Sequence, residues 1–245
     1  MSVVSHFSNA AQTYDGAADI QREIAEKLAA HIVRLTPRCE DLRILEIGCG
    51  TGLLTSHLEG RFRDAASLYM VSDYSQAMIE VCREKIPPIA SLLAYLACNG
   101  ERLPFKKPTF DLIVSSMVFQ WFKNPAQSIL RMRELLKPGG HIIYSTVGSN
   151  NFPEWRQFLE SKGLTCGMRD DLPKSYPGEF QNEHIIKDYE NAHGFLEMLR
   201  ATGANKPRDG HKSKSIREFL KRINDYNGVA TWHIVYGALP AATLE

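Results

Sequence analysis

The sequence predicts an α/β fold, in which helices flank a mostly parallel central sheet. Short apolar runs typical of buried strands alternate with stretches whose apolar residues recur every three or four positions, as in amphipathic helices. A glycine-rich turn joins the first apolar run to the helical stretch after it. With 44% hydrophobic and 23% charged residues, the chain of 245 residues has the composition of a globular protein that can bury a core.

The first 148 residues follow this alternation in order. We expect strands at 44–47, 68–72, 93–97, 111–115 and 141–147, and helices at 16–35, 53–58, 76–85 and 125–136. The segment Pro138-Gly139-Gly140 is expected to end the last of these helices. Because strands separated by helices pair in parallel through right-handed crossovers, this part of the sheet should be parallel. Farther along, we expect helices at 152–162, 192–200 and 215–223 and strands at 183–189 and 231–236.

Charge and cysteine content argue against several classes of protein. The net charge of +1 gives no global field that would favour nucleic acid or an anionic membrane as a partner. Five widely spaced cysteines without a C-x-x-C pair indicate neither a disulfide framework nor a zinc site, and the histidine spacing indicates no other metal. No run approaches the roughly 18 apolar residues that span a bilayer, and no signal-peptide pattern opens the chain. We therefore expect a cytoplasmic protein with free thiols.

A glycine loop, Gly48-Cys49-Gly50-Thr51-Gly52, follows the first expected strand. Glycines at alternate positions permit a tight turn and let a ligand approach bare backbone. The loop also lies at the edge of an open parallel sheet where ligands bind. A dinucleotide fingerprint would need a glycine where Leu53 stands, and a P-loop would need a Gly-Lys-Ser or Gly-Lys-Thr sequence. A different ligand is therefore expected.

Two carboxylates accompany the glycine loop. Glu46, just before it, would repel a pyrophosphate but attract an ammonium group. Asp73 ends the second expected strand, where an acidic residue in such folds accepts hydrogen bonds from ribose hydroxyls. The alternative interpretation is that both residues only cap strand ends. Their association with three glycines favours a cofactor site.

These residues resemble the first motif of the class I S-adenosylmethionine-dependent methyltransferases, an acidic residue followed by Gly-x-Gly-x-Gly. The resemblance runs from about Ile44 to Val147. It implies a Rossmann-like fold, S-adenosyl-L-methionine as cofactor and S-adenosyl-L-homocysteine as product. It also implies cofactor contacts from a set of residues, Glu46, Gly48, Cys49, Gly50, Gly52, Asp73, Tyr74, Asn99, Gly100 and Ser115.

The resemblance further assigns parts of the cofactor to these residues. Glu46 and the glycine loop would hold the methionine portion, Asp73 the ribose and Tyr74 the face of the adenine. Asn99 stands where the family has an acidic residue. Its amide oxygen can still accept a hydrogen bond from the adenine amino group.

Three further stretches resemble one branch, the malonyl acyl-carrier-protein methyltransferases of biotin synthesis. They are residues 7–15 leading to Asp19-Ile20-Gln21, residues 115–121 ending in Gln120-Trp121, and residues 199–204, which include Arg200. The resemblance implies methylation of the free carboxylate of malonyl-acyl carrier protein to its methyl ester, at the start of the pimeloyl part of biotin synthesis. The alternatives are a methyltransferase for another small carboxylate, quinone or natural product, and a non-catalytic protein that binds S-adenosylmethionine.

The resemblance gives a division of the single expected domain. Residues 1–36 would form an N-terminal helical cover, residues 42–148 the cofactor-binding core, residues 149–180 a lid or substrate insertion, and residues 181–245 the C-terminal strands with a basic helix. The insertion is expected because residues 163–178 are rich in Gly, Pro and Asp and show no periodic pattern.

Tyr14, Gln120, Trp121 and Arg200 are the candidate catalytic residues. A carboxylate acceptor is ionised near neutral pH and needs no strong general base, so these residues would position groups and not transfer protons. Tyr14 would orient the acceptor or the methionine carboxylate, Gln120 and Trp121 would contact the cofactor or the acceptor, and Arg200 would pair with the malonyl carboxylate. Tyr14 and Trp121 are also interpretable as packed aromatic residues of the core.

Residues 200–222 are locally basic, with eight Lys or Arg residues against two acidic ones. Such a region would suit an acidic acyl carrier protein that delivers the malonyl group. A solvated helix face is the alternative. Nucleic acid is not expected to bind there, because no row of aromatic residues offers a stacking platform.

Overall fold

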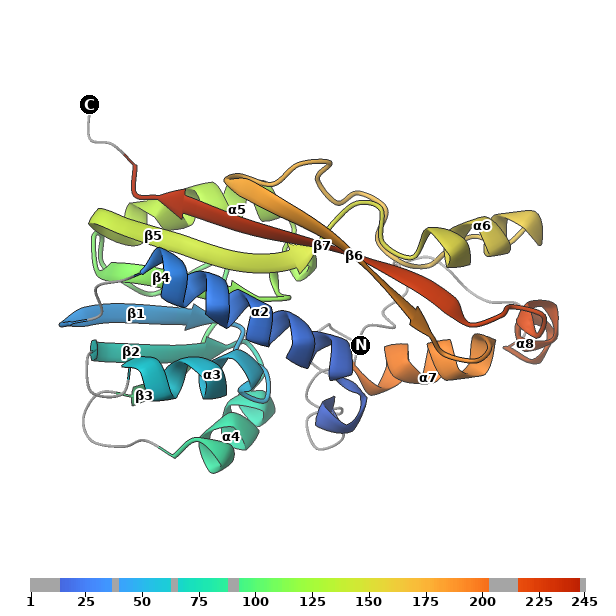
Figure 1. Ribbon diagram of the computed structural model, residues 1–245, viewed down its shortest axis with the longest axis horizontal. Helices are drawn as coiled ribbons and strands as arrows, with labels where there is room; N and C mark the ends of the chain where they lie inside the picture. Colours follow the sequence, from blue (N-terminus) through green and yellow to red (C-terminus); the bar gives the residue numbers. More distant parts are fainter. Residues whose placement is uncertain (1–13, 37–39, 63–65, 88–92, 203–215, 243–245) are drawn as a thin grey trace.

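Seven strands form one sheet with helices on both faces in the computed structural model, which describes residues 14–36, 40–62, 66–87, 93–202 and 216–242 (Figure 1). The strands are β1 (Leu42–Ile47), β2 (Ala66–Asp73), β3 (Leu93–Ala97), β4 (Phe110–Ser116), β5 (Leu136–Val147), β6 (Glu179–Asp188) and β7 (Val229–Pro240). Their order is β3-β2-β1-β4-β5-β7-β6, and β7 runs antiparallel to both of its neighbours. The expected mostly parallel α/β sheet is confirmed.

The helices lie close to their expected positions. They are α2 (Asp19–Leu35), α3 (Leu53–Phe62), α4 (Gln76–Lys85), α5 (Pro125–Met132), α6 (Pro153–Ser161), α7 (Ala192–Ala201) and α8 (Ile216–Ile223). Short 3-10 turns are η1 (Tyr14–Ala17), η3 (Phe119–Trp121) and η4 (Arg133–Leu135). Helix α2 buries Ile20, Ile24, Leu28 and Ile32, which recur at every fourth position and pack the helix against α3, β4 and β5.

The sheet separates two hydrophobic cores. Because successive side chains of a strand point to opposite faces, neighbouring residues of β1 enter different cores. Ile44 packs in the core under α2, α3 and α4, whereas Leu45 packs in the core under α5. Burial on both faces explains why these strands are almost continuously apolar in the sequence.

The segment Pro138-Gly139-Gly140 does not end a helix, which corrects the expectation from the sequence. Helix α5 ends at Met132, η4 follows, and β5 already begins at Leu136 instead of at residue 141. The proline and the glycines therefore lie inside a strand. The helix begins at the predicted residue but is shorter, and the strand ends at the predicted residue but begins five residues earlier.

A bulge in β5 explains these glycines. The pairing of β4 with β5 is irregular between Phe110 and Leu112, opposite the four residues 137–140. Gly139 has a φ of +80°, a conformation that favours glycine. A Cβ on Gly140 would lie 2.9 Å from the carbonyl oxygen of Asp111. The glycines thus serve close strand pairing at a bulge.

The C-terminal part extends beyond the parallel strands. Residues 234–240 of β7 pair with β5, whereas residues 229–233 pair with β6 alone. The resulting two-stranded ribbon runs past the end of β5, and α6, α7 and α8 gather around its far end (Figure 1). We call this ribbon and the three helices the C-terminal extension.

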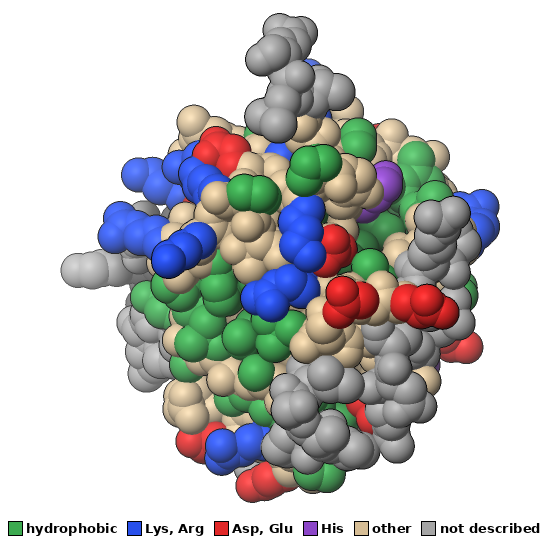
Figure 2. Space-filling view, turned by 90° about the vertical axis from the view of Figure 1, so that its left-hand side faces the viewer, with side chains coloured by type: hydrophobic (Ala, Val, Ile, Leu, Met, Phe, Trp, Pro, Cys, Tyr) green, Lys and Arg blue, Asp and Glu red, His purple; other side chains and the backbone are tan. Residues whose placement is uncertain are grey.

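The amino ends of the parallel strands lie at the opposite end of the molecule. Figure 2 shows this face, on which Lys and Arg side chains lie beside Asp and Glu side chains. Lys137 pairs with Asp111 at 2.7 Å, and Lys107 pairs with Glu134. Within the described residues, no helix combines the length and the apolar character needed to cross a membrane.

Candidate active site

The glycine loop turns at the carboxyl end of β1 with three residues in the left-handed region of backbone conformation. Gly48, Gly50 and Gly52 have φ values of +68°, +54° and +92°. A Cβ on Gly48 would lie 2.3 Å from a methyl carbon of Val118, and one on Gly52 would lie 2.9 Å from the Cys82 sulfur. Gly48 and Gly52 are therefore explained by conformation and by close packing, whereas Gly50, where a Cβ would meet nothing within 4 Å, is explained by conformation alone.

Glu46 is buried beneath the loop, with 1% of its surface exposed. Its carboxylate accepts hydrogen bonds from the hydroxyls of Thr55, at 3.0 Å, and Tyr69. Burial raises the pKa of Glu46 to about 7, against the lowering effect of the Tyr69 and Thr55 hydrogen bonds. The carboxyl group is therefore held in place and is close to half-ionised at neutral pH.

Asp73, at the end of β2, connects the loop with the start of α4. One carboxylate oxygen accepts from the backbone N–H of Gly50 at 2.9 Å, and the other accepts from that of Ser75 at 2.8 Å. Burial raises the pKa of Asp73, and these backbone donors oppose the increase. Each oxygen keeps a second lone pair, so the carboxylate can still accept from a ligand.

A cavity of about 590 Å³ opens at the carboxyl ends of the strands β1 to β4. Among its walls are predicted site residues, namely Tyr14, Glu46, Gly48, Cys49, Gly50, Asp73, Tyr74, Asn99, Gly100 and Trp121. The described lining carries the carboxyl groups of Glu46, Asp73 and Glu101 and includes no Lys, Arg or His. The cavity is thus suited to a ligand that carries positive charge.

S-adenosylmethionine fits these features. Its sulfonium and ammonium groups are cations that the three carboxyl groups would attract, and the bare backbone of the glycine loop admits close approach. Asn99 lies on the adjoining wall, where its Oδ1 accepts from the backbone N–H of Glu101 at 2.8 Å. A Cβ on Gly100 would come within 2.8 Å of the Phe122 ring.

The turn η1 brings Tyr14 to the cavity. Asp15 beside it pairs with Lys85 of α4 and accepts a hydrogen bond from the Thr51 hydroxyl of the glycine loop. Burial, with Asp73 and Asp15 nearby, raises the pKa of Tyr14 well above its usual value. The hydroxyl therefore stays protonated at neutral pH and serves as a hydrogen-bond donor.

Four predicted site residues lie outside the cavity wall. Gly52 packs against α4, and the Ser115 hydroxyl donates to the carbonyl oxygen of Ile47 at 2.9 Å. The Gln120 amide donates to the carbonyl oxygen of Met117 at 2.6 Å and accepts from the Thr146 hydroxyl at 2.9 Å. Arg200 lies on the exposed side of α7. Ser115 and Gln120 are placed to shape the strand ends around the site.

Several wall residues were not predicted from the sequence. They include Gln21, Met78, Val118, Glu101 and Phe122. Gln21 and Val118 lie in stretches that resemble the family, and Gln21 is also a polar residue within the buried stripe of α2. Met78, Glu101 and Phe122 are ordinary apolar or charged residues that chain folding brings to the cavity.

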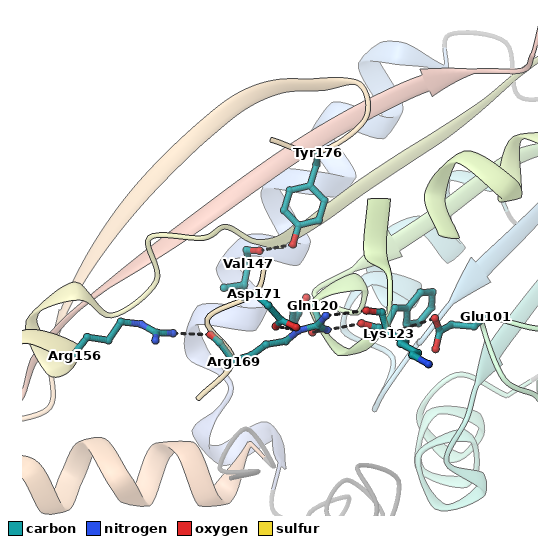
Figure 3. Close-up of polar contacts among 9 residues, drawn as sticks. Glu101, Gln120, Lys123, Val147, Arg156, Arg169, Asp171 and Tyr176 are labelled. Carbon is teal, nitrogen blue, oxygen red and sulfur yellow. Dashed lines mark hydrogen bonds and ion pairs between the residues drawn. The ribbon is translucent and has the colours of Figure 1, made fainter. Parts of the chain in front are cut away.

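Arg169 fastens the segment after α6 to the turn η3 (Figure 3). Its guanidinium donates to the backbone carbonyls of Gln120 at 2.9 Å, of Phe122, and of Lys123 at 3.0 Å. It also pairs with Asp171 at 2.6 Å. An arginine suits these three carbonyl acceptors, because its guanidinium group holds several N–H donors in one plane.

Two more contacts hold the same segment. Arg156 of α6 donates to the carbonyl oxygen of Arg169 at 2.7 Å, and the Tyr176 hydroxyl donates to that of Val147 at 3.0 Å (Figure 3). Part of the expected insertion at residues 149–180 is thereby attached to η3, which carries Trp121 at the cavity.

Four of the five cysteines lie within the described residues, and none of the four forms a disulfide. Cys49, Cys82, Cys98 and Cys166 are free thiols, and Cys39 lies outside the described residues. Among the residues that the structure describes, no three His, Cys, Asp or Glu side chains are grouped to hold a metal ion.

Comparisons with known proteins agree with this geometry. A family model described as "Methyltransferase domain" matches residues 45–144. The malonyl-[acyl-carrier protein] O-methyltransferase of Magnetococcus marinus is 32% identical over 241 residues, which cover 93% of this chain and 88% of that protein. The biotin biosynthesis bifunctional protein BioCD of Bordetella avium is 31% identical, over 96% of this chain and 51% of that protein.

A solved structure supports the fold. Phosphoethanolamine N-methyltransferase 2 of Haemonchus contortus, in complex with S-adenosyl-L-methionine, matches with a TM-score of 0.55 at 16% identity, over 98% of this chain and 60% of that one. At that identity the likeness concerns the fold alone. The relative from Magnetococcus marinus places the chain in the malonyl-[acyl-carrier protein] O-methyltransferase family, whose members are S-adenosylmethionine-dependent methyltransferases, and the solved structure agrees with a class I, Rossmann-like fold.

Proposed function

We propose that the chain transfers the methyl group of S-adenosylmethionine to the free carboxylate of a malonyl group on an acyl carrier protein, forming the methyl ester. The relative from Magnetococcus marinus supports this acceptor by its name and its match to 93% of the chain. In the structure, the observation that carries the proposal is the protonated hydroxyl of Tyr14 at the cavity, which can donate a hydrogen bond to an acceptor carboxylate that is already ionised.

The protonation and the hydrogen bonds of the wall residues indicate how methyl transfer would proceed. When bound, S-adenosylmethionine supplies an electrophilic methyl group on a positively charged sulfur. An ionised carboxylate can attack such a group without a general base. Tyr14 keeps its proton, Glu46 is engaged by Thr55 and Tyr69, and Asp73 is engaged by two backbone N–H groups. The contribution of the protein is therefore orientation and the exclusion of water.

We assign cofactor contacts to the predicted residues that line the cavity. Glu46 and the glycine loop would face the methionine portion, and Asp73 the ribose. Tyr74, whose side chain is 59% exposed, and Asn99 would face the adenine. Replacement of Asp73 by Ala should raise the dissociation constant for S-adenosylhomocysteine at least tenfold, and a change below twofold would refute the ribose assignment.

Acceptor contacts are assigned to Tyr14 and Trp121, which line the cavity. Arg200 lies outside the cavity, and its proposed pairing with the malonyl carboxylate has no support from its position on α7. Gln120 is more simply explained as a residue that holds η3 in place through Met117 and Thr146.

The basic region 200–222 is the proposed docking surface for the acidic carrier protein. Residues 203–215 of this region lie outside the described residues, so the proposal rests on the sequence charge. Exchange of Arg208, Lys212 and Lys214 for Glu should raise the KM for the carrier protein at low salt and leave the affinity for S-adenosylhomocysteine unchanged. An unchanged KM would refute this surface.

Methyl transfer from labelled S-adenosylmethionine provides the central test. Malonyl carrier protein should be labelled rapidly, succinyl carrier protein and free malonate slowly, and the label should be released by mild base as expected for a methyl ester. Rapid labelling of free malonate would indicate a small-acid methyltransferase. Cofactor binding without labelling of any of the three would indicate another acceptor or a protein that only binds the cofactor.

A further inference from the structure

Gln21 is a polar side chain in an unusual position. It lies near the start of α2, within the stripe of residues that the helix buries, and only 7% of its surface is exposed. It also forms part of the cavity wall. Within the described part of the chain, its amide makes no hydrogen bond, although buried amides are normally paired.

The amide of Gln21 is not sealed inside the protein. No side-chain nitrogen or oxygen of the described residues is both fully enclosed and without a hydrogen-bond partner. Because Gln21 has no such partner among the described residues, its amide is not fully enclosed, and the residue forms part of the cavity wall. A buried polar group without a partner lowers stability, and a bound ligand is the partner that this position offers.

Several other neutral polar atoms of the wall are already engaged, whereas the Tyr14 and Tyr74 hydroxyls are further candidate donors. The Thr51 hydroxyl donates to Asp15, and the hydroxyl of Ser116 bonds with that of Ser145 at 3.2 Å. The Asn99 oxygen accepts from the backbone N–H of Glu101. Gln21 is therefore distinguished from these wall residues by an amide that remains available to a ligand.

The chemical groups of the proposed ligands indicate what this amide binds. The proposed reaction brings two carboxylates into the cavity, one on the methyl acceptor and one on the methionine portion of the cofactor. The described wall offers neither of them a Lys, Arg or His. A primary amide has two N–H donors and is a neutral group that can serve a carboxylate without adding charge.

We propose that Gln21 is a ligand-contacting residue whose side-chain NH₂ group donates a hydrogen bond to a carboxylate bound in the cavity. The inference deepens the proposed function and rests on it for the identity of the acceptor. The carboxylate of the acceptor and that of the cofactor have the same chemistry, and binding measurements with matched probes separate them.

The test compares Gln21→Met, which keeps the length of the side chain and removes its polarity, with Gln76→Met. Gln76 is an exposed residue of α4 that bonds to Glu80 at 3.1 Å and lies outside the cavity wall, so it controls for the chemical change itself. Each variant is titrated with S-adenosylhomocysteine and with its decarboxylated analogue. Each is then titrated, in the presence of S-adenosylhomocysteine, with carrier protein bearing a malonyl or an acetyl group.

We expect Gln21→Met to weaken binding of one carboxylate-bearing probe about tenfold or more, and of its carboxylate-free counterpart less than twofold. A loss with S-adenosylhomocysteine assigns Gln21 to the cofactor, and a loss with the malonyl carrier assigns it to the acceptor. Gln21→Glu should weaken the same probe further, because it places an anion opposite the carboxylate. Gln76→Met should change none of the affinities.

The melting temperature gives a second criterion. A purely structural glutamine would lose packing or hydrogen bonds on replacement, whereas Gln21→Met should leave the melting temperature equal or higher, because it removes an unpaired buried amide. The proposal is overturned if all four affinities stay within twofold, or if both members of a probe pair weaken equally. Failure of the wild-type protein to methylate malonyl carrier protein would refute the proposed function. Titrations with S-adenosylhomocysteine and its decarboxylated analogue would then still show whether Gln21 binds the cofactor carboxylate.

Discussion

The glycine loop and the C-terminal extension are stabilised in different ways. Around the loop, the contacts are polar: Asp73 binds the N–H groups of Gly50 and Ser75, and Glu46 binds two hydroxyls. In the extension, aromatic rings from distant segments pack edge to face, as Phe152 does against Phe195 and Trp232. Loop residues are constrained by backbone conformation and ligand access, whereas extension residues are constrained by packing.

Substitutions in the two regions should therefore have different effects. A substitution at the loop should reduce ligand affinity as well as stability, because the proposed cofactor contacts and the packing contacts involve the same residues. A substitution in the extension should reduce stability and leave cofactor affinity unchanged. The four variants below test this separation, in order of expected effect.

Gly48→Ala should have the largest effect. The new Cβ would lie 2.3 Å from Val118, at a residue with a φ of +68°. Strain of this kind costs on the order of 1–3 kcal/mol, and displacement of Val118 adds to it. We expect a drop in the free energy of unfolding, measured in urea, and a rise of roughly 100-fold in the dissociation constant for S-adenosylhomocysteine, equivalent to about 2.7 kcal/mol.

The double variant Gly48→Ala with Val118→Ala serves as the control, because it removes the two closest contacts, leaves the Val118 Cβ at 3.1 Å and keeps the strained conformation. It should recover part of the lost stability. Binding of S-adenosylhomocysteine by Gly48→Ala within twofold of the wild type would show that the loop does not form the cofactor cradle.

The pH dependence of stability should report the buried Glu46. Its pKa is raised from 4.5 to about 7 in the folded protein, so the native state binds more protons than the unfolded chain between these values. The stabilising contribution is complete below pH 4.5 and is lost as the pH rises through 7, with a slope of up to about 1.4 kcal/mol per pH unit. Urea unfolding between pH 5 and pH 8 should show this slope in the wild type.

In Glu46→Gln, the slope should be smaller by that amount, because the amide does not titrate. Asp73, whose pKa is also raised, leaves a residual slope of the same sign in both proteins. Cationic S-adenosylmethionine should favour the ionised form of Glu46, so its affinity for the wild type should increase up to about pH 7. Identical slopes for wild type and Glu46→Gln would contradict the assignment of the buried proton.

Arg169→Ala tests the connection between the two regions. The substitution leaves the carbonyl oxygens of Gln120, Phe122 and Lys123 without their guanidinium donor. We expect a loss of about 1–3 kcal/mol in the free energy of unfolding and a higher KM for the methyl acceptor. The affinity for S-adenosylhomocysteine should stay within threefold.

Arg169→Lys is the matched variant, since it keeps the charge but cannot span three acceptors. Its stability and KM should fall between those of the wild type and Arg169→Ala. Should both variants show the wild-type KM, Arg169 would hold the segment without influencing the acceptor site.

Trp232→Phe should have the smallest effect. Its indole N–H donates to the Tyr189 hydroxyl at 2.9 Å, and its ring packs against Phe152 at a centroid distance of 4.6 Å. Loss of the hydrogen bond and of part of the ring should lower the free energy of unfolding by about 1–2 kcal/mol. Isothermal titration should give an unchanged affinity for S-adenosylhomocysteine; a tenfold loss would show that the extension and the loop are coupled.

Predictions from the sequence succeeded where a feature depends on neighbouring residues. The alternation of strands and helices, the glycine loop and the carboxylates at the ends of β1 and β2 all follow from local pattern. The prediction for Pro138-Gly139-Gly140 was wrong because the same residues that end helices also allow bulges, and the pairing of β4 with β5 decides between them.

The sequence by itself therefore determined the order of elements, the turn that faces the cavity and the family to which the chain belongs. Tertiary structure alone decided which side chains meet at the cavity and which do not. It placed Gln21 on the wall without a partner among the described residues, turned the Gln120 amide toward Met117 and Thr146, and left Arg200 exposed on α7. The physical reason is that backbone conformation and amphipathic pattern are local properties, whereas the surroundings of a side chain depend on segments far apart in the sequence.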